Sequence, residues 1–445
     1  MRLFRCRKKP VLQTDLTYEQ YITPWYDWQT RFIALCFNSD VICCPKTLSF
    51  VISPLALSTL LYMLYLGANE RTRKIILDLL HLKEKDVDNI SRGYKLLAPF
   101  YKKAKTIYSS NLFLVSDVYI HPQYLINNTY EQTLQDIFGN TIKELESDSF
   151  VEKIHQLSGS RITYVETSPT MQTSMAGVAI TVLEANWDAE KVYEYNIEPF
   201  ETHYGMQTKQ LYIAIKGRLR FYRDMEQESC CIPLKTQKNS NKQSLRLNLL
   251  LIRPRRKGEV YQFEKLLTEN KLQQILTGIK NSQVTTSVIL VPQMALPDNG
   301  NEATLVDMMN CWQKLKEENI FKRINEKLNI SYCYHFASIT LSKEGVGFML
   351  KKCSKNITEA PTNPYVCHLQ STNQPFAIRY DTPFLFLLYE STYNISFIVG
   401  CYAGKPAIAR KQDASVTISA GQNTYVCSIG LALGSVVLAA LFHCR

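Results

Sequence analysis

The chain has 445 residues, of which 46% are hydrophobic and 20% are charged, which is the composition of an ordinary globular protein. No interior stretch is rich in proline, glycine or serine and no internal repeat is apparent, so the sequence favours one large domain. The formal net charge is +11. Short groups of basic residues can bind polyanions or anionic membranes, although solvated helix faces and strand ends explain most of them. These groups are Arg2–Lys9, Lys102–Lys105, Arg218–Arg223 and Arg253–Lys257.

Motifs that would indicate an enzyme or a metalloprotein are missing. The sequence has no G-x-S-x-G, H-E-x-x-H, P-loop or G-x-G-x-x-G pattern, and its seven histidines are scattered. Its thirteen cysteines include no C-x-x-C pair and no His/Cys group at metal spacing. Because thirteen is odd, at least one cysteine is unpaired or bonded between chains. We therefore predict a protein that is not an enzyme and that has no metal, cofactor or nucleic-acid partner.

The first half of the chain carries clear helix signals. Residues 1–15 form a basic tail without the apolar core of a signal peptide. A first amphipathic helix is predicted to begin at Thr23-Pro24, because threonine is a good N-cap and proline suits the first helical position. A short strand at Leu48–Ile52 precedes Ser53-Pro54, which has the same start signal. The following LALSTLLYMLYLG is apolar nearly all round and predicts a helix buried on every side, and Thr72–Leu82 predicts another helix.

Six stretches of the sequence follow one known pattern in their order and spacing. They are FVISPLALSTLLYMLYLGANERTRKII, TIYSSNLFLVSDVYIHPQYL, IKGRLRFYRD, LRLNLLLIRP with FEKLLTENKLQQIL, YHFASITLSKEG, and DTPFLFLLYE with ISFIVGCYAGKP. Over roughly residues 16–407 the chain therefore resembles one known family, the serpins. The resemblance implies an α+β serpin fold with three β-sheets, about eight to nine helices and an exposed reactive-centre-type loop. It also places His335 at a family histidine, where a structural role is expected rather than that of a base.

Departures from the family pattern concern the moving part of the fold. The resemblance implies that a target protease cleaves the loop of an inhibitory serpin, and that the freed loop then inserts into the main sheet as a new central strand. Ser49 and Thr382 stand where the family favours Asn and His, in the polar cluster behind that sheet. The stretch VLEANWDAEKVYEYN follows the family pattern only loosely. Such divergence would suit a viral or otherwise fast-evolving member.

The predicted hinge of the loop contains bulky residues and is followed by two lysines. Inhibitory members have small uncharged residues here, because the inserted strand is buried. Successive strand residues face opposite sides, so one register buries Lys352 and the register shifted by one buries Lys351. Burying an unpaired ammonium costs several kcal/mol, and a bulky side chain adds about 1–3 kcal/mol by overpacking. Insertion is therefore predicted to be impaired by this hinge, which comprises Glu344, Gly345, Val346, Gly347, Phe348, Met349 and Leu350.

The loop after the hinge is long, and long loops in compact domains are usually functional. Counting from the hinge places the scissile bond near Glu359-Ala360, whereas counting back from the next strand places it near Gln370. Both positions stay open. The loop also contains two cysteines that can bridge and one glycan acceptor, with chance as the alternative for each: Cys353, Cys367 and Asn356.

The pattern Asn-x-Ser/Thr marks candidate glycosylation sites, but so short a pattern recurs by chance. The candidates are Asn89, Asn127, Asn329 and Asn356. A fifth match, Asn394, is predicted to lie in an apolar strand and to stay unmodified.

The C-terminal segment predicts a membrane anchor. Residues 414–442 carry no charge, and Tyr425–Phe442 is almost wholly apolar. A helix of this length spans roughly 27 Å, enough for a thin bilayer, and a core helix would normally show a polar face. We expect a serpin domain over 16–410, a linker over 411–424 and a single-pass anchor over 425–442. A tail anchor with a cytosolic globular part and export through an internal signal are both compatible with this pattern.

The sequence predicts a membrane-anchored, non-inhibitory serpin-like protein that acts as a binding or decoy module through its long loop, with a protein or a protease as the partner. The first alternative is a serine or cysteine protease inhibitor that uses the suicide-substrate mechanism. The second alternative is a protein that binds heparin-like polyanions through its basic groups, for which steep salt dependence would be diagnostic.

Overall fold

The structure is a computed structural model of the chain. It describes residues 14–38, 49–96, 112–139, 142–202, 205–235, 246–256, 267–297, 303–310, 312–317, 320–348, 377–391 and 394–404. All of them lie within one compact unit, Met1–Lys405. Across these ranges no helix is long and apolar enough to cross a membrane, and the predicted anchor lies outside them. The helices are α1 (Thr14–Asn38), α2 (Pro54–Gly67), α3 (Glu70–Leu80), α5 (Asn128–Phe138), α6 (Phe150–Leu157), α8 (Glu269–Asn281), α9 (Gln313–Glu317) and the 3-10 turns η1 (Glu84–Asp86) and η2 (Met308–Asn310).

The strands form two hydrogen-bonded networks. The first contains β1 (Phe50–Ile52), β7 (Lys191–Glu201), β8 (Gln207–Arg223), β9 (Gln227–Pro233), β10 (Leu247–Pro254), β11 (Val284–Pro292), β16 (Ile378–Arg379), β17 (Phe384–Glu390) and β18 (Ile395–Tyr402). Its order is β1-β18-β17-β10-β9-β8-β11-β16, with β7 paired to β8.

The second network contains β2 (Leu112–Ile120), β3 (Ile142–Glu144), β4 (Ile162–Val165), β5 (Met175–Leu183), β6 (Ala185–Asn186), β12 (Met294–Leu296), β13 (Ala303–Asp307), β14 (Ile330–Leu341) and β15 (Gly345–Val346). Its order is β3-β2-β5-β14-β13-β4, with β12 and β15 on β14 and β6 on β15.

The expected α+β fold is confirmed, and the long strand β8 joins two of the three expected sheets. The first part of β8 pairs with β7, and its middle pairs with β11. Its last residues, Arg220–Arg223, pair with β9. One continuous strand therefore links the two sheets of the first network.

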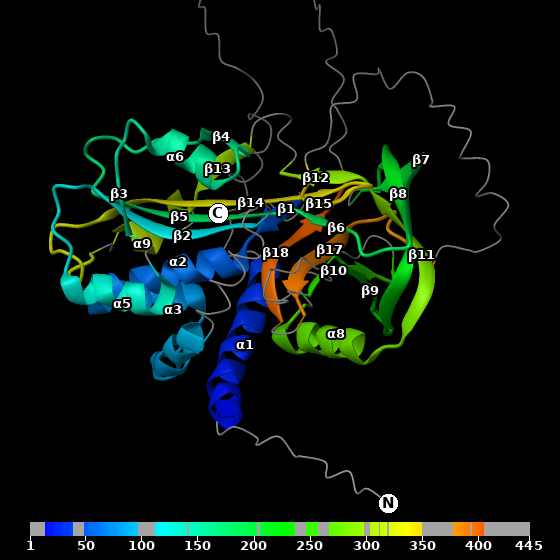
Figure 1. Ribbon diagram of the computed structural model, residues 1–445, viewed down its shortest axis with the longest axis horizontal. Helices are drawn as coiled ribbons and strands as arrows, with labels where there is room; N and C mark the ends of the chain where they lie inside the picture. Colours follow the sequence, from blue (N-terminus) through cyan, green and yellow to red (C-terminus); the bar gives the residue numbers. More distant parts are fainter. Residues whose placement is uncertain are drawn as a thin grey trace, which may run out of the picture. The chain divides into compact units, whose positions relative to one another are not determined.

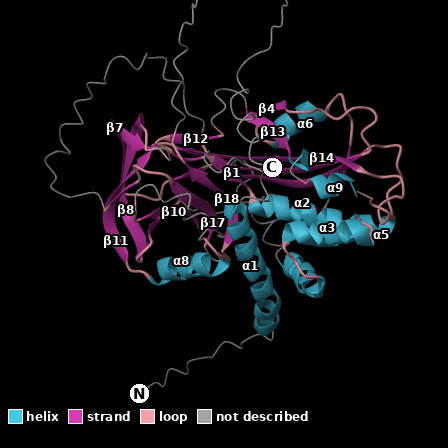
Figure 2. Cartoon of the chain, turned by 180° about the vertical axis from the view of Figure 1, so that it is seen from behind, coloured by secondary structure: helices cyan, strands magenta, loops and turns pink. Residues whose placement is uncertain are grey.

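Both faces of the second network are covered. In Figure 1, α6 lies over one face of β2, β5 and β14, and α2, α3 and α5 lie beneath the other. Figure 2 shows the same arrangement from behind. Alternation along β5 explains it, because Met175, Ala179 and Leu183 pack toward α2 while Val178 and Ile180 pack toward α6. A strand inserted between β5 and β14 would therefore enter a layer that is buried on both faces.

Helix α2 confirms its predicted start and burial. Ser53 is the N-cap, and its Oγ accepts a hydrogen bond from the backbone N–H of Ala56 at 3.2 Å. Every residue of the helix except Leu66 is buried. This apolar helix lies beneath β5 and β14.

The predicted start of the first helix is wrong. Helix α1 begins at Thr14, so Pro24 lies inside it rather than at its first position. A proline inside a helix removes one backbone hydrogen bond and strains the preceding turn. Trp25, Trp28 and Phe32, each at most 2% exposed, anchor the same stretch in the core, and this packing offsets the cost.

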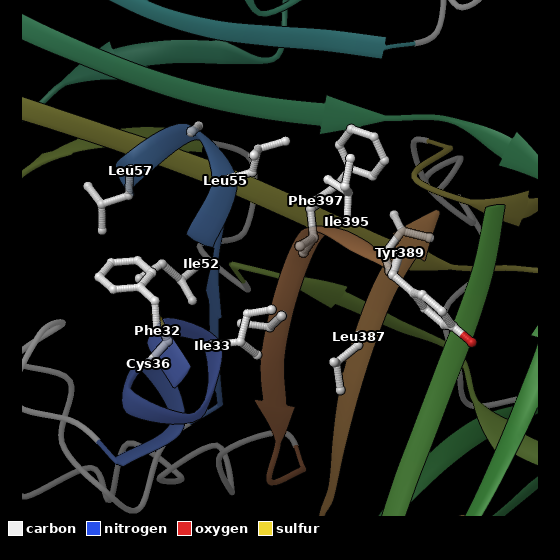
Figure 3. Close-up of a cluster of buried hydrophobic side chains, with 14 of the residues drawn as sticks. Phe32, Ile33, Cys36, Ile52, Leu55, Leu57, Leu387, Tyr389, Ile395 and Phe397 are labelled. Atoms are coloured by element: carbon white, nitrogen blue, oxygen red, sulfur yellow. The ribbon is translucent and has the colours of Figure 1, made fainter. Parts of the chain in front are cut away.

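One apolar cluster packs helices α1 and α2 against strands of the first network (Figure 3). It gathers side chains of α1, β1, α2, β17 and β18, among them Phe32, Ile52, Leu57, Leu387 and Phe397. Because β1 and the start of α2 are held by this cluster, the N-terminus of α2 is fixed directly under the seam between β5 and β14.

Candidate functional site: the hinge after β14

The central seam of the second network is closed. Strands β5 and β14 run parallel and pair from Ile330↔Met175 to Ser338↔Val182. Beyond this paired region the two strands separate, and the chain after β14 turns back between them.

Two hinge residues, Gly345 and Val346, already occupy a strand position at the end of this seam. Ser342 donates its N–H to the carbonyl of Gly345 at 3.0 Å, which closes a tight turn. Strand β15 then pairs antiparallel with β14 at Leu341↔Val346 and with β6 at Val346↔Ala185. The hinge is thus docked between β14 and β6 over Gly345 and Val346.

Two glycines permit this docking. Gly345 and Gly347 have φ angles of 156° and 84°, which L side chains rarely adopt. A Cβ on Gly345 would collide with the carbonyl of Ala185, and a Cβ on Gly347 with that of Leu183. Both glycines are therefore needed for the close approach of the backbone.

Arg161 and Glu184 hold the far end of the docked segment. Arg161, in the turn between α6 and β4, donates from Nη1 to the carbonyl of Gly347 at 2.7 Å and pairs with the carboxylate of Glu184. The side chain of Arg161 is only 11% exposed, and its burial lowers the pKa of the guanidinium. Gly347 in turn donates its N–H to the carbonyl of Thr340 at 2.7 Å. We call Arg161, Glu184 and Gly347 the hinge clamp.

The near end of the docked segment is held by two further side chains. Trp187 donates its indole N–H to the carbonyl of Ser342 at 2.8 Å, and Asn186 donates its side-chain amide to the carbonyl of Glu344 at 3.0 Å. The turn and the docked pair are therefore bonded along their whole length, from Ser342 to Gly347.

Val346 decides between the two registers that the sequence leaves open. Its side chain is 0% exposed and packs in the cluster on the α2 side of the seam. Because alternate strand residues share a face, a strand continuing from Val346 would place Phe348, Leu350 and Lys352 on that side. In this register Lys352 would face the α2 side on insertion, and Lys351 would face the α6 side.

A polar cluster under the seam joins α2 to both central strands. The Oγ of Ser53 lies 2.7 Å from the Oγ1 of Thr181 on β5, and the backbone N–H of Ser53 donates to Nε2 of His335 on β14 at 3.1 Å. His335 is 7% exposed, and burial lowers its pKa to about 4. The expected structural role of His335 is confirmed, since its ring accepts a hydrogen bond as the neutral form.

The divergent residues Ser49 and Thr382 have other surroundings. Ser49 accepts a hydrogen bond from the backbone N–H of Ala403 at 2.9 Å, which ties the start of β1 to the end of β18, and Thr382 is buried beside β17. Serine at position 49 therefore serves the first network, while Ser53, Thr181 and His335 hold the seam.

Comparisons with known proteins match this architecture. The family model "Serpin (serine protease inhibitor)" matches residues 44–403. The chain belongs to the serpin family. Heparin cofactor 2 of Rattus norvegicus is 23% identical over 371 residues, covering 78% of this chain and 71% of the rat protein.

Solved serpin structures share the fold. The thermophilic serpin tengpin in its native state gives a TM-score of 0.63 at 16% identity and covers 87% of this chain and 95% of its own. Maspin gives a TM-score of 0.65 at 14% identity, and the match covers 87% of this chain and 100% of the maspin chain. Native protease nexin-1 with heparin gives a TM-score of 0.63 at 14% identity, and the match covers 86% of this chain and 100% of the nexin chain.

Of the other predicted loop residues in this serpin, Phe348 is half-buried beside Gly345. The remaining predictions for the loop lie outside the described residues, so they stay predictions. They concern Met349, Leu350, Asn356, the scissile candidates Glu359, Ala360 and Gln370, and the bridge between Cys353 and Cys367.

The glycan acceptor candidates that the structure describes differ in access. Asn127 is exposed and caps α5 through its side-chain oxygen, Asn329 is exposed before β14, and Asn89 is half-buried. The predicted placement of Asn394 in a strand is wrong, because this residue is exposed in the turn between β17 and β18 with a φ of 51°. Asparagine adopts that left-handed conformation more readily than most residues, which suits it to the turn.

Two of the predicted basic groups contain arginines that are paired with acidic residues. Arg253 pairs with Glu228 at 2.9 Å and with Asp381 at 3.5 Å, and Arg223 pairs with Glu228 at 3.4 Å. Arg220 donates to the carbonyls of Lys280 and Ser282. The groups Arg2–Lys9 and Lys102–Lys105 lie outside the described residues.

A cationic cluster that sequence reasoning missed lies at the start of α3. Residues 320–327, which precede β14, are hydrogen-bonded to the start of α3. Asn69 donates its N–H to Ile320 O and Arg323 donates its N–H to Gly67 O, both at 3.1 Å. Residues 67–74 and 320–327 together contain six Lys and Arg against two Glu. Burial and then the nearby charge of Arg323 lower the pKa of Arg73. No sequence signal could have found this cluster, because its halves are about 250 residues apart.

Proposed function

We propose that this serpin is a binding module rather than a suicide inhibitor, and that its long loop is the surface that contacts a partner. The register of β15 carries the proposal. Insertion of the loop would continue β15 between β5 and β14, so the partners of each inserted residue follow from the pairs Val346↔Leu341 and Val346↔Ala185.

Lys352 would enter the seam at its most unfavourable point. It lies six residues after Val346, and six residues before Leu341 and Ala185 are His335 and Ala179. The ammonium would therefore lie beside the polar cluster at the N-terminus of α2, whose dipole disfavours a cation. Burying an unpaired ammonium there costs several kcal/mol. Phe348 would in addition lie between Ile339 and Leu183, where overpacking costs about 1–3 kcal/mol.

Loop cleavage tests this proposal directly. A site for a specific endoprotease is engineered at Glu359-Ala360 and, in a second version, at Gln370, and the melting temperature is measured before and after the cut. We expect the cut and uncut proteins to melt within a few degrees of each other, because the inserted strand gains little net stability. A rise of tens of degrees would show that the strand inserts, and the inhibitor mechanism would replace this proposal.

The inhibitor alternative has its own assay. The name of the matched family model and the rat relative favour it at the level of the family. An SDS-stable complex between this serpin and any serine or cysteine protease would establish it. A panel of proteases that cleave the loop without forming such a complex would instead support the binding module.

Polyanion binding is a second candidate function, favoured by the cationic cluster at α3. The solved structure of protease nexin-1 contains heparin, and heparin cofactor 2 carries heparin in its name. Lys74→Glu together with Arg323→Glu should lower the salt concentration that elutes the protein from heparin. The matched control is Arg218→Glu with Arg256→Glu, on the other network. Equal elution of both variants would assign heparin binding to other residues.

The membrane anchor is part of the proposal and is supported by the apolar segment Tyr425–Phe442. Deleting residues 425–445 should move the protein from the membrane to the soluble fraction. Retention in membranes would contradict the anchor. An endoglycosidase mobility shift of the full chain would place the globular part on the secretory side, and its absence would favour a cytosolic tail-anchored protein.

A further inference from the structure

A small pocket lies where β14 changes partners. The outer edge of strand β14 pairs with β13 at Tyr334 and His335 and with β12 from Ile339 to Leu341. Among the described strands, none pairs with this edge between those two stretches. The pocket opens there against β1 and has a volume of about 240 Å³. Its lining is mostly apolar and includes Phe50, Ile52, Pro297, Val306 and Met308.

One polar group in this lining stands out. His335 is among the residues that line the pocket, and this residue is 7% exposed. Its Nε2 accepts the N–H of Ser53, so the neutral ring carries its proton on Nδ1. Within the described ranges, no group accepts a hydrogen bond from Nδ1. An acceptor oxygen placed in the pocket within reach of this N–H would gain that hydrogen bond.

We propose that this pocket binds a small, uncharged, largely apolar molecule with one hydrogen-bond acceptor, such as an aryl ketone, ester or amide, whose oxygen accepts from Nδ1 of His335. No lysine or arginine lines the pocket, and a carboxylate would lose its hydration without gaining a counter-ion. A cavity of about 150 Å³ holds benzene, so this one suits a ligand of about ten heavy atoms. The ligand would bridge β1 and β14 beside the polar cluster, and it would favour the closed seam.

A pair of isosteric probes tests the acceptor. Acetophenone and α-methylstyrene have the same shape, but the second has a methylene in place of the carbonyl oxygen. Both are titrated into the full-length protein labelled with ¹⁵N-histidine. We expect acetophenone to shift one histidine resonance, to raise the melting temperature and to bind at least about fivefold more tightly, since one neutral hydrogen bond contributes about 1 kcal/mol. Equal binding of the two probes, or no binding of either, would overturn the proposal.

Two exposed valines provide a matched pair of variants. Val306 is 45% exposed at the mouth of the pocket, whereas Val284 is 39% exposed on β11 and lines a different cavity. Val306→Trp should block acetophenone binding, and Val284→Trp should leave it unchanged. His335→Gln should remove the shifted resonance. Binding that survives Val306→Trp would place the ligand elsewhere and refute the proposal, even if His335→Gln fails to fold.

Discussion

His335 accepts a hydrogen bond that only its neutral ring can accept, and this makes the seam sensitive to acid. Burial lowers its pKa to about 4 in the folded protein, whereas an unfolded histidine titrates near 6.5. Between these values the unfolded chain binds more protons than the folded one, so stability decreases as the pH falls. The full effect is about 3 kcal/mol, present above pH 6.5 and lost by about pH 4.

The pH dependence is checked by denaturant unfolding between pH 4 and pH 7. His335→Gln keeps an acceptor for Ser53 but cannot titrate, so its stability should fall less steeply with acid than that of the wild type. The control is His81→Asn, at an exposed position whose φ of 49° suits asparagine. Identical slopes for His335→Gln and the wild type would rule out His335 as the source.

The hinge clamp makes a second prediction at the residue scale. Arg161→Met removes the bond to Gly347 O and leaves Glu184, whose side chain is 27% exposed, without its partner. We expect a loss of about 2 kcal/mol in unfolding free energy and faster hydrogen exchange at the Gly347 amide. Adding Glu184→Gln should restore part of the stability but not the slow exchange. Unchanged exchange in Arg161→Met would mean that the clamp does not restrain the hinge.

At the scale of single elements, the start of α2 serves two purposes. The Oγ of Ser53 caps the helix through Ala56 N–H and also lies within hydrogen-bond distance of Thr181 on β5. From sequence, Ser53→Ala costs about 1 kcal/mol through the lost cap. The structure raises the expected loss to about 2–3 kcal/mol, because the fully buried hydroxyl of Thr181 also loses its partner.

A double-mutant cycle separates these two contributions. Adding Thr181→Val to Ser53→Ala removes the orphaned hydroxyl, so the double variant should be less destabilised than the sum of the two single variants. The unfolding free energies are measured by urea denaturation. Simple additivity would show that the bond between the two hydroxyls contributes nothing.

At the scale of the whole molecule, insertion depends on the side chains that follow the docked hinge. Replacing Phe348, Lys351 and Lys352 with Ala, Thr and Thr removes the bulky group and both ammonium groups. After loop cleavage, this triple variant should melt tens of degrees higher than before, because a full strand of backbone hydrogen bonds then forms at little cost. Met349→Ala is the control, since it shortens a side chain on the α6 side and leaves both ammonium groups in place. If the melting temperature of the cleaved triple variant does not rise, the length of the loop or the hinge clamp prevents insertion instead.

Local signals in the sequence determined much of the fold. The Ser53-Pro54 start, the apolar body of α2 and the alternation in β14 each depend on neighbouring residues, so they could be predicted. The serpin resemblance ordered these elements into an architecture. The start of α1 was mispredicted because core packing of Trp25 overrode the local preference of Pro24.

The tertiary structure alone decided the chemistry of the hinge. Contacts between distant segments determine which face each of Lys351 and Lys352 would occupy on insertion. They also determine the pairing of Arg161 with Gly347 and the donor of His335. Gly347, for example, is 186 residues from Arg161. Such contacts depend on strand register and on which face a helix presents, and these are set by the packing of the whole core. A local pattern carries no information about them, which is why the sequence predicted an impaired hinge but could not say which face each lysine would occupy or what holds the hinge in place.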